Sequence, residues 1–177
     1  KNLIVLGNPG TGKSIFIKSV ICEILKQSEN NLEFNNAKIY SFVPFRIELR
    51  KYLAYKKENG QNILQYLLYL LTTEFGIVNL LYENILQIFK EKPLIFFDGL
   101  DEIFNLEDKI EVRNDIEVFH NSYPAALSVT SSRIIGYDDA KFTQETFIEI
   151  QIQNFNYKQI EDYVSKWYDK EEEDQKI

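Results

Sequence analysis

A glycine-rich turn lies between an apolar run and a helical segment at the start of the chain, and this arrangement narrows the choice of fold at once. The run Leu3–Leu6 leads into Gly7-Asn-Pro-Gly-Thr-Gly-Lys-Ser14, which matches the phosphate-loop (Walker A) pattern G-x-x-x-x-G-K-[ST] in full. The pattern requires a strand before it and a helix after it, and 15–25 is apolar on most sides, as in a buried helix. The chain is therefore expected to form an α/β domain.

The residue types of this turn suit the binding of a nucleoside triphosphate. Glycines let the backbone curl so that successive N–H groups point at phosphate oxygens, and the following helix adds its positive end. Lys13 would supply a charge for the β- and γ-phosphates, and the Ser14 hydroxyl would ligate Mg²⁺. A turn that binds nothing is the alternative, and the strand–loop–helix context argues against it. The predicted nucleotide-binding residues are Gly7, Asn8, Pro9, Gly10, Thr11, Gly12, Lys13 and Ser14.

An acidic motif follows a second apolar strand. The run 93–97 ends in Asp98-Gly-Leu-Asp-Glu102, and a carboxylate at the end of a buried strand is what a Walker B element needs to hold Mg²⁺ beside a nucleotide. Many P-loop proteins place a water-activating acid directly after that carboxylate, but here this position is Gly99. Asp101 and Glu102 are therefore the candidate catalytic acids. The alternative is that one or both only cap the loop or helix after the strand.

Strands and helices alternate along most of the chain. Strands are expected at 3–6, 43–49, 93–97, 125–130 and 147–152, and helices at 15–25, 61–75, 80–89, 107–119 and 156–168. Residues 27–36 are polar and predict a loop, and Asn156 is expected to cap the last helix. Pro44 favours an edge position for the second strand. This alternation predicts an α/β fold around a mostly parallel sheet.

Composition limits the partners and the compartment. The net charge of −7 argues against a surface for nucleic acid, and no apolar stretch approaches the length of a membrane span. Cys22, expected in the core, is the single cysteine, so a reducing cytoplasm is the expected compartment. The single histidine, His120, is expected at the surface or a helix end, without a metal. The chain begins on a strand and contains no Met, so we expect an excised piece of a longer protein.

Three motifs together resemble the NACHT domain of the STAND signal-transduction ATPases. They are the phosphate loop, Leu94-Ile-Phe-Phe-Asp-Gly-Leu-Asp-Glu102 and Ser128-Val-Thr-Ser-Ser-Arg133. The stretches Val43-Pro-Phe-Arg-Ile-Glu-Leu-Arg-Lys51 and 147–167 are similar to bacterial-type members. The likeness covers nearly the whole chain, and the Asp-Gly-Leu-Asp-Glu form is its more specific part.

The resemblance implies a fold and a set of roles. The fold would be a three-layer P-loop NTPase domain with a five-stranded parallel sheet in the order 5-1-4-3-2. Residues 1–153 would form this core, and 154–177 the beginning of a small helical subdomain. Asp98 would hold Mg²⁺, and the acids at 101 and 102 would activate water. Arg133 would be a catalytic sensor that touches the γ-phosphate, with a surface pair to Asp138 or Asp139 as the alternative.

Two functions stay open at this point. The first is slow, Mg²⁺-dependent hydrolysis of ATP by a switch module of a signalling or innate-immune defence protein, whose nucleotide state controls self-association. The second is a regulatory module that binds ATP or ADP as a structural ligand without significant turnover. A P-loop kinase ranks last, because the sequence offers no arginine-rich lid. No direct binding of this segment to nucleic acid or membranes is expected.

Overall fold

A five-stranded parallel sheet forms the centre of the protein. The computed structural model describes residues 1–30, 42–90 and 93–174. The strands lie in the order β2-β3-β4-β1-β5, and every neighbouring pair is parallel. Read from the other edge, this order is 5-1-4-3-2, so the predicted topology and the edge position of the second strand are confirmed. The strands are β1 (Asn2–Leu6), β2 (Val43–Glu48), β3 (Pro93–Asp98), β4 (Leu127–Ser132) and β5 (Phe147–Gln151).

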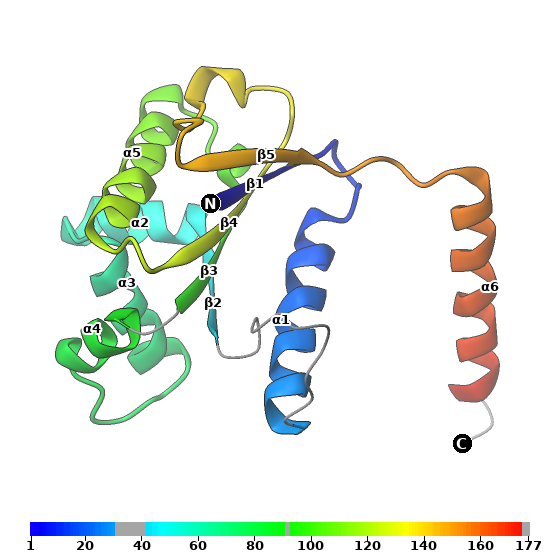
Figure 1. The fold of residues 1–177 in the computed structure, drawn as a ribbon, viewed down its shortest axis with the longest axis horizontal. Helices are drawn as coiled ribbons and strands as arrows, with labels where there is room; N and C mark the ends of the chain where they lie inside the picture. The colour runs from blue at the N-terminus through cyan, green and yellow to red at the C-terminus, as the bar shows by residue number, and fades with distance from the viewer. Residues whose placement is uncertain (31–41, 91–92, 175–177) are drawn as a thin grey trace.

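Helices cover both faces of the sheet and complete the three layers. Figure 1 shows α1 on one side of the sheet and α2 to α5 on the other. The α-helices are α1 (Lys13–Asn30), α2 (Leu49–Asn59), α3 (Ile63–Tyr69), α4 (Tyr82–Lys90), α5 (Leu106–Ser122) and α6 (Tyr157–Asp174). Short turns are the π-helical η2 (Leu70–Glu74) and the 3₁₀-helical η3 (Leu100–Glu102) and η4 (Asp138–Ala140). None of the described helices combines the length and the apolar character needed to cross a bilayer.

The central strand β3 contributes to the hydrophobic core on both faces. All six of its residues are buried, as expected for a parallel strand between two helical layers. Phe96 packs with Ile17 of α1 on one side of the sheet, whereas Phe97 belongs to the larger cluster formed with α2 to α5. Because side chains alternate along a strand, these two rings fix β3 between the layers. They thereby fix the position of Asp98 at its carboxyl end.

Several predicted boundaries are wrong, and one helix was not predicted. The strand predicted at 43–49 is one residue too long, because Leu49 begins α2, which is the helix that was not predicted. The loop expected at 27–36 is wrong at 27–30, where α1 continues, and its remainder lies outside the described residues. The helix expected at 61–75 begins with the capping box of Asn62 and Gln65 but passes into a π-helical turn at 70–74. β4 lies two residues later than predicted, so Arg133 directly follows its last residue.

The expected burial of Cys22 is wrong, because this residue is exposed. His120 lies near a helix end, as predicted, but it is buried. His120 Nε2 lies 2.7 Å from Ser128 Oγ, and the rings of Phe119 and Phe147 pack edge-on against the imidazole. Burial lowers the pKa of His120 to about 4, because the apolar surroundings disfavour the charged ring.

This depressed pKa predicts a loss of stability in mild acid. Below its ordinary pKa of 6.5 the unfolded histidine takes up a proton, whereas the folded one stays neutral until about pH 4. The stability that the folded protein gains from a neutral His120 is therefore fully present above pH 6.5 and is lost as the pH falls toward 4. Between about pH 7.5 and pH 5, His120 should lower the free energy of unfolding by about 2 kcal/mol. Urea unfolding at the two pH values measures this change.

The variant His120→Gln is the control, because its side chain does not titrate. Between the same two pH values, the decrease in its free energy of unfolding should be smaller than that of the wild type by about 2 kcal/mol. An identical pH dependence in both proteins would contradict the assignment to His120.

Candidate functional site

Residues from three parts of the sequence meet at the carboxyl edge of the sheet. They line one cavity of about 300 Å³. The phosphate loop contributes Pro9, Gly10, Gly12, Lys13 and Ser14 to its wall; the acidic motif contributes Asp98, Asp101 and Glu102; and the end of β4 contributes Arg133. The structure thus brings together all the residues predicted to hold metal or to act in catalysis. The remaining loop residues, Gly7, Asn8 and Thr11, are not part of the wall.

The phosphate loop owes its shape to glycine at three positions. Gly10 and Gly12 have φ values of +79° and +86°, a region that L-residues rarely adopt. Gly7 is needed for a different reason, because a Cβ there would lie 2.5 Å from Thr11 Oγ1. The Thr11 hydroxyl in turn donates to the Asn8 carbonyl at 2.8 Å. These contacts close the turn in front of the N-terminus of α1.

Lys13 lies folded across the loop. Its Nζ donates to the Gly7 carbonyl at 2.8 Å and to the Asn8 carbonyl at 3.3 Å. The ammonium group is therefore held next to the cavity by neutral acceptors of the loop itself. A phosphate group in the cavity would be a stronger, charged acceptor for the same donor.

Asp98 is a buried carboxylate whose two oxygens have different partners. Its side chain is 6% exposed. Oδ1 accepts hydrogen bonds from Ser14 Oγ at 3.2 Å and from Ser131 Oγ at 2.7 Å. The Ser131 hydroxyl also accepts the Gly99 N–H at 2.8 Å. Ser131 therefore connects β4 to the turn after β3 and orients the carboxylate toward Ser14.

The other oxygen, Asp98 Oδ2, is bound by Arg46 of β2. Arg46 Nη2 and Nε approach it at 2.8 and 3.3 Å, while Nη1 donates to Glu48 at 3.1 Å. Partial burial lowers the pKa of Arg46, but the hydrogen bonds and charges of Asp98 and Glu48 outweigh this effect and raise it. Arg46 belongs to the stretch 43–51 that resembles bacterial-type members, but the sequence predicted no role for it. The parallel register, in which Glu48 lies opposite Asp98, is what brings it to the site.

The two candidate acids of η3 have different surroundings. Asp101 is mostly buried and forms an ion pair with Arg133, whose Nε lies 2.7 Å from Asp101 Oδ2. Glu102 is exposed, and its side chain folds back over Gly99, where a Cβ would lie 3.0 Å from its carboxyl carbon. The helix after this turn, α5, is capped by Asn105 and not by either acid. Arg133 pairs with Asp101, whereas Asp138, one of its two alternative partners, pairs with Lys141.

Ser14 and Asp98 suit a magnesium ion that is shared with a nucleotide. No cluster of three or more histidine, cysteine, aspartate or glutamate side chains that could hold a metal occurs among the residues that the structure describes. Mg²⁺ commonly binds through one or two protein oxygens and completes its coordination with phosphates and water. A hydroxyl and a carboxylate oxygen 3.2 Å apart on the cavity wall are such a donor pair.

The position of Ser131 between two buried groups predicts a measurable loss of stability in Ser131→Ala. The substitution removes the donor to Asp98 and leaves the Gly99 N–H without its acceptor. The free energy of unfolding should fall by about 1–3 kcal/mol. Urea unfolding measures it, with Ser132→Ala as the matched control, since that hydroxyl donates only to the Arg133 carbonyl. Equal losses in the two variants would contradict the role given to Ser131.

Comparisons with known proteins agree with this arrangement. The family model described as the NACHT domain matches residues 1–171. A search of curated protein sequences found no match.

Among solved structures, the Orc1 protein of Aeropyrum pernix, determined in complex with DNA, matches 96% of this chain and 44% of its own, with a TM-score of 0.57 and 12% identity. This chain therefore spans less than half of the Orc1 chain. A KaiC-like protein of Pyrococcus horikoshii matches 88% of this chain and 73% of its own, with a TM-score of 0.44 and 16% identity. The Orc1 similarity supports the α/β fold alone, whereas the family match covers almost the whole chain. The chain therefore belongs to the NACHT domain family.

Proposed function

We propose that this nucleotide-binding NTPase module hydrolyses ATP in a Mg²⁺-dependent reaction and serves as the switch of a STAND signalling protein. The observation that carries the proposal is the shared cavity, in which the phosphate loop faces Asp98, two further carboxylates and Arg133. A site for binding alone needs the loop and the metal ligands. The additional acids and the arginine supply the groups that water attack on a γ-phosphate requires.

Binding would rearrange the loop side chains only locally. Lys13 would leave the Gly7 and Asn8 carbonyls for the β- and γ-phosphates, while the loop N–H groups donate to phosphate oxygens. Ser14 and Asp98 would hold Mg²⁺, which neutralises negative charge on the phosphates when bound. The burial of Asp98 keeps its carboxylate oriented toward Ser14 throughout.

We assign different tasks to the two acids. Asp101 is held in an ion pair with Arg133, so it acts by orienting the guanidinium toward the γ-phosphate. Glu102 has no cation within ion-pair distance among the described residues and is exposed at the cavity wall. It is therefore the better candidate for orienting and deprotonating water.

A second candidate function is regulatory binding of ATP or ADP without significant turnover. The ion pair between Arg133 and Asp101 favours it, because a guanidinium held at 2.7 Å by a carboxylate has to be released or shared before it can serve a phosphate. Multiple-turnover phosphate release distinguishes the two candidates. An enzyme releases several equivalents of phosphate, whereas a regulatory module retains its nucleotide after purification.

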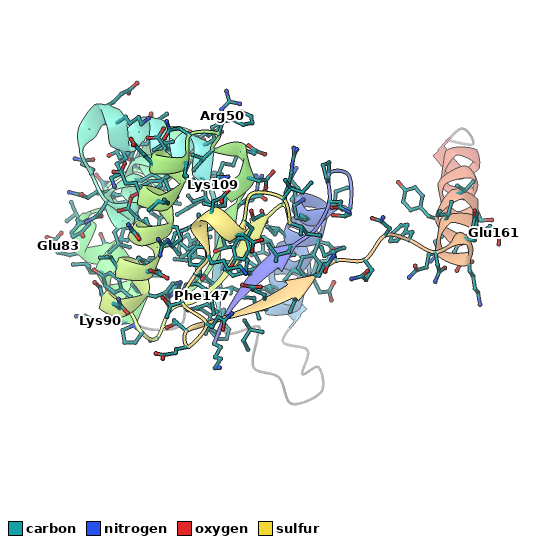
Figure 2. All side chains as sticks on the ribbon, turned by 90° about the horizontal axis from the view of Figure 1, so that it is seen from above. Arg50, Glu83, Lys90, Lys109, Phe147 and Glu161 are labelled. Carbon is teal, nitrogen blue, oxygen red and sulfur yellow. The ribbon has the colours of Figure 1, made fainter. Side chains whose placement is uncertain are left out.

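We further propose that residues 1–153 are the catalytic core and that 154–177 begin a helical subdomain. Asn156 caps α6 as the sequence predicted, and this helix stands apart from the layers of the sheet in Figure 1 and in Figure 2, where Glu161 marks it. Its exposed apolar residues Ile160 and Val164 are available to further parts of a longer protein. Self-association, bacterial-type ancestry, a cytoplasmic location and a role in innate defence belong to this proposal.

Removing the loop lysine tests the binding site. Lys13→Ala should raise the Kd for ATP by roughly 100-fold, because charge-assisted hydrogen bonds to the phosphates are lost. Isothermal titration with ATP and Mg²⁺ measures the affinity. Lys18→Ala, which removes an exposed lysine of the same helix, is the control and should bind ATP like the wild type. Unchanged affinity in Lys13→Ala would exclude the loop as the phosphate site.

Changing the acids tests the catalytic assignment. Glu102→Gln should lower phosphate release roughly 100-fold or more with little change in ATP affinity, because a general base acts in the transition state. Asp101→Asn should lower it less, through a misplaced Arg133. The exposed Glu107 of α5 offers a control, and Glu107→Gln should leave turnover unchanged. Intact turnover in both Glu102→Gln and Asp101→Asn would show that the base lies elsewhere.

A further inference from the structure

The ion pair between Arg46 and Asp98 solves a problem of buried charge. Asp98 is 6% exposed, and a carboxylate removed from water is costly unless a cation compensates it. Its hydroxyl partners are neutral, so they orient the charge without cancelling it. Among the described residues, the cation within ion-pair distance of Asp98 is Arg46, at 2.8 Å. The charge balance of this carboxylate therefore depends on Arg46.

A magnesium ion at the same carboxylate changes this balance. It would bring two positive charges to a group that already carries a bound guanidinium, and charges of like sign at such distances repel strongly. Arg46 and the metal are therefore in competition for Asp98. The guanidinium holds Oδ2, whereas the donor pair suited to the metal uses Oδ1, so the two compete through their charges at one carboxylate and not for one atom.

Arg46 has a second acceptor within reach. Its Nη1 already donates to Glu48 at 3.1 Å, so the guanidinium can stay on Glu48 when its other nitrogens leave Asp98. The side chains of Arg46 and Glu48 line a cavity of about 350 Å³ next to the site, together with Lys51 and Glu74. This cavity gives the guanidinium room on the side away from Asp98. Glu48 and Glu74 supply negative charge there; both pair with Lys51, and Lys18 adds a second lysine to the wall.

We propose that Arg46 is a positioning residue that compensates Asp98 in the nucleotide-free site and moves onto Glu48 when Mg²⁺ and nucleotide bind. The inference rests on the proposed function, since it takes the site to bind a magnesium–nucleotide complex. Arg46 thereby lowers the affinity of the site for the metal, and Glu48 restores part of it by accepting the displaced guanidinium. Metal binding is in this way coupled to the edge strand β2.

The variant Arg46→Gln tests the competition. A fluorescent ATP analogue reports binding while free Mg²⁺ is varied with a chelator buffer, and the concentration that gives half of the magnesium-dependent signal is measured. This concentration should fall by roughly tenfold in Arg46→Gln, because a repelling charge is removed. Arg50→Gln is the charge-matched control, since Arg50 is exposed at the start of α2 (Figure 2). It should stay within about twofold of the wild type.

The variant Glu48→Gln should act in the opposite direction. Without the second acceptor, Arg46 remains on Asp98, and the half-saturating Mg²⁺ concentration should rise about threefold or more. In the double variant Arg46→Gln/Glu48→Gln most of this rise should disappear, because Glu48 acts through Arg46. A purely structural role of either residue predicts no such dependence of one substitution on the other.

The outcomes separate the inference from the proposed function. If the wild type binds the analogue with Mg²⁺ but Arg46→Gln has the same magnesium dependence as Arg50→Gln, the competition is overturned and the proposed function stands. If the wild type binds no analogue at any Mg²⁺ concentration, the proposed function fails and the inference fails with it. If Arg46→Gln does not fold, as judged by circular dichroism, Glu48→Gln decides, and an unchanged or lower magnesium requirement overturns the inference.

Discussion

The burial of one carboxylate at the end of the central strand organises the site. Asp98 stays in place because Phe96 and Phe97 fill the two cores on either side of β3. A charged group in that position has to be hydrogen-bonded and compensated, and its partners come from three elements: Ser14 of α1, Arg46 of β2 and Ser131 of β4. The same contacts that lower the cost of burial therefore hold the phosphate loop, the edge strand and β4 in register around the cavity.

A second carboxylate–guanidinium pair, between Asp101 and Arg133, stands on the same cavity wall. Both arginines of the site are thus satisfied by carboxylates, and Lys13 is satisfied by loop carbonyls. Binding of ATP with Mg²⁺, as we propose it, replaces the internal partners of Lys13 and Arg133 by phosphate oxygens, and replaces the Arg46 guanidinium on Asp98 by the metal. An exchange of partners yields less net free energy than the satisfaction of unpaired charges. The net affinity of the proposed site is therefore lower than the number of its contacts suggests.

The sequence was sufficient to predict those parts of the fold and of the site that depend on a local pattern of residues. The phosphate loop, the apolar strand before Asp98 and the cap at Asn156 are each encoded within a dozen residues, and the strand order followed from the resemblance. Contacts between strands were not predictable in the same way. Arg46 and Ser131 reach Asp98 only because β2 and β4 flank β3 in a particular register. Likewise, the burial of His120 depends on packing against Phe147, which comes from a distant strand.

The turn after β3 explains why the neighbouring acids Asp101 and Glu102 have different surroundings. Gly99 has a φ of +86°, a conformation that a residue with a Cβ would adopt only under strain, so an acid directly after Asp98 would require a different turn. The 3₁₀ turn that follows directs Asp101 to Arg133 and returns the Glu102 side chain to the space beside Gly99. Glu102 thus brings a carboxylate close to the position from which a residue 99 side chain would project. The roles that we propose for the two acids therefore follow from their surroundings in space, the Arg133 guanidinium for Asp101 and the exposed cavity wall for Glu102, and not from their distance from Asp98 along the chain.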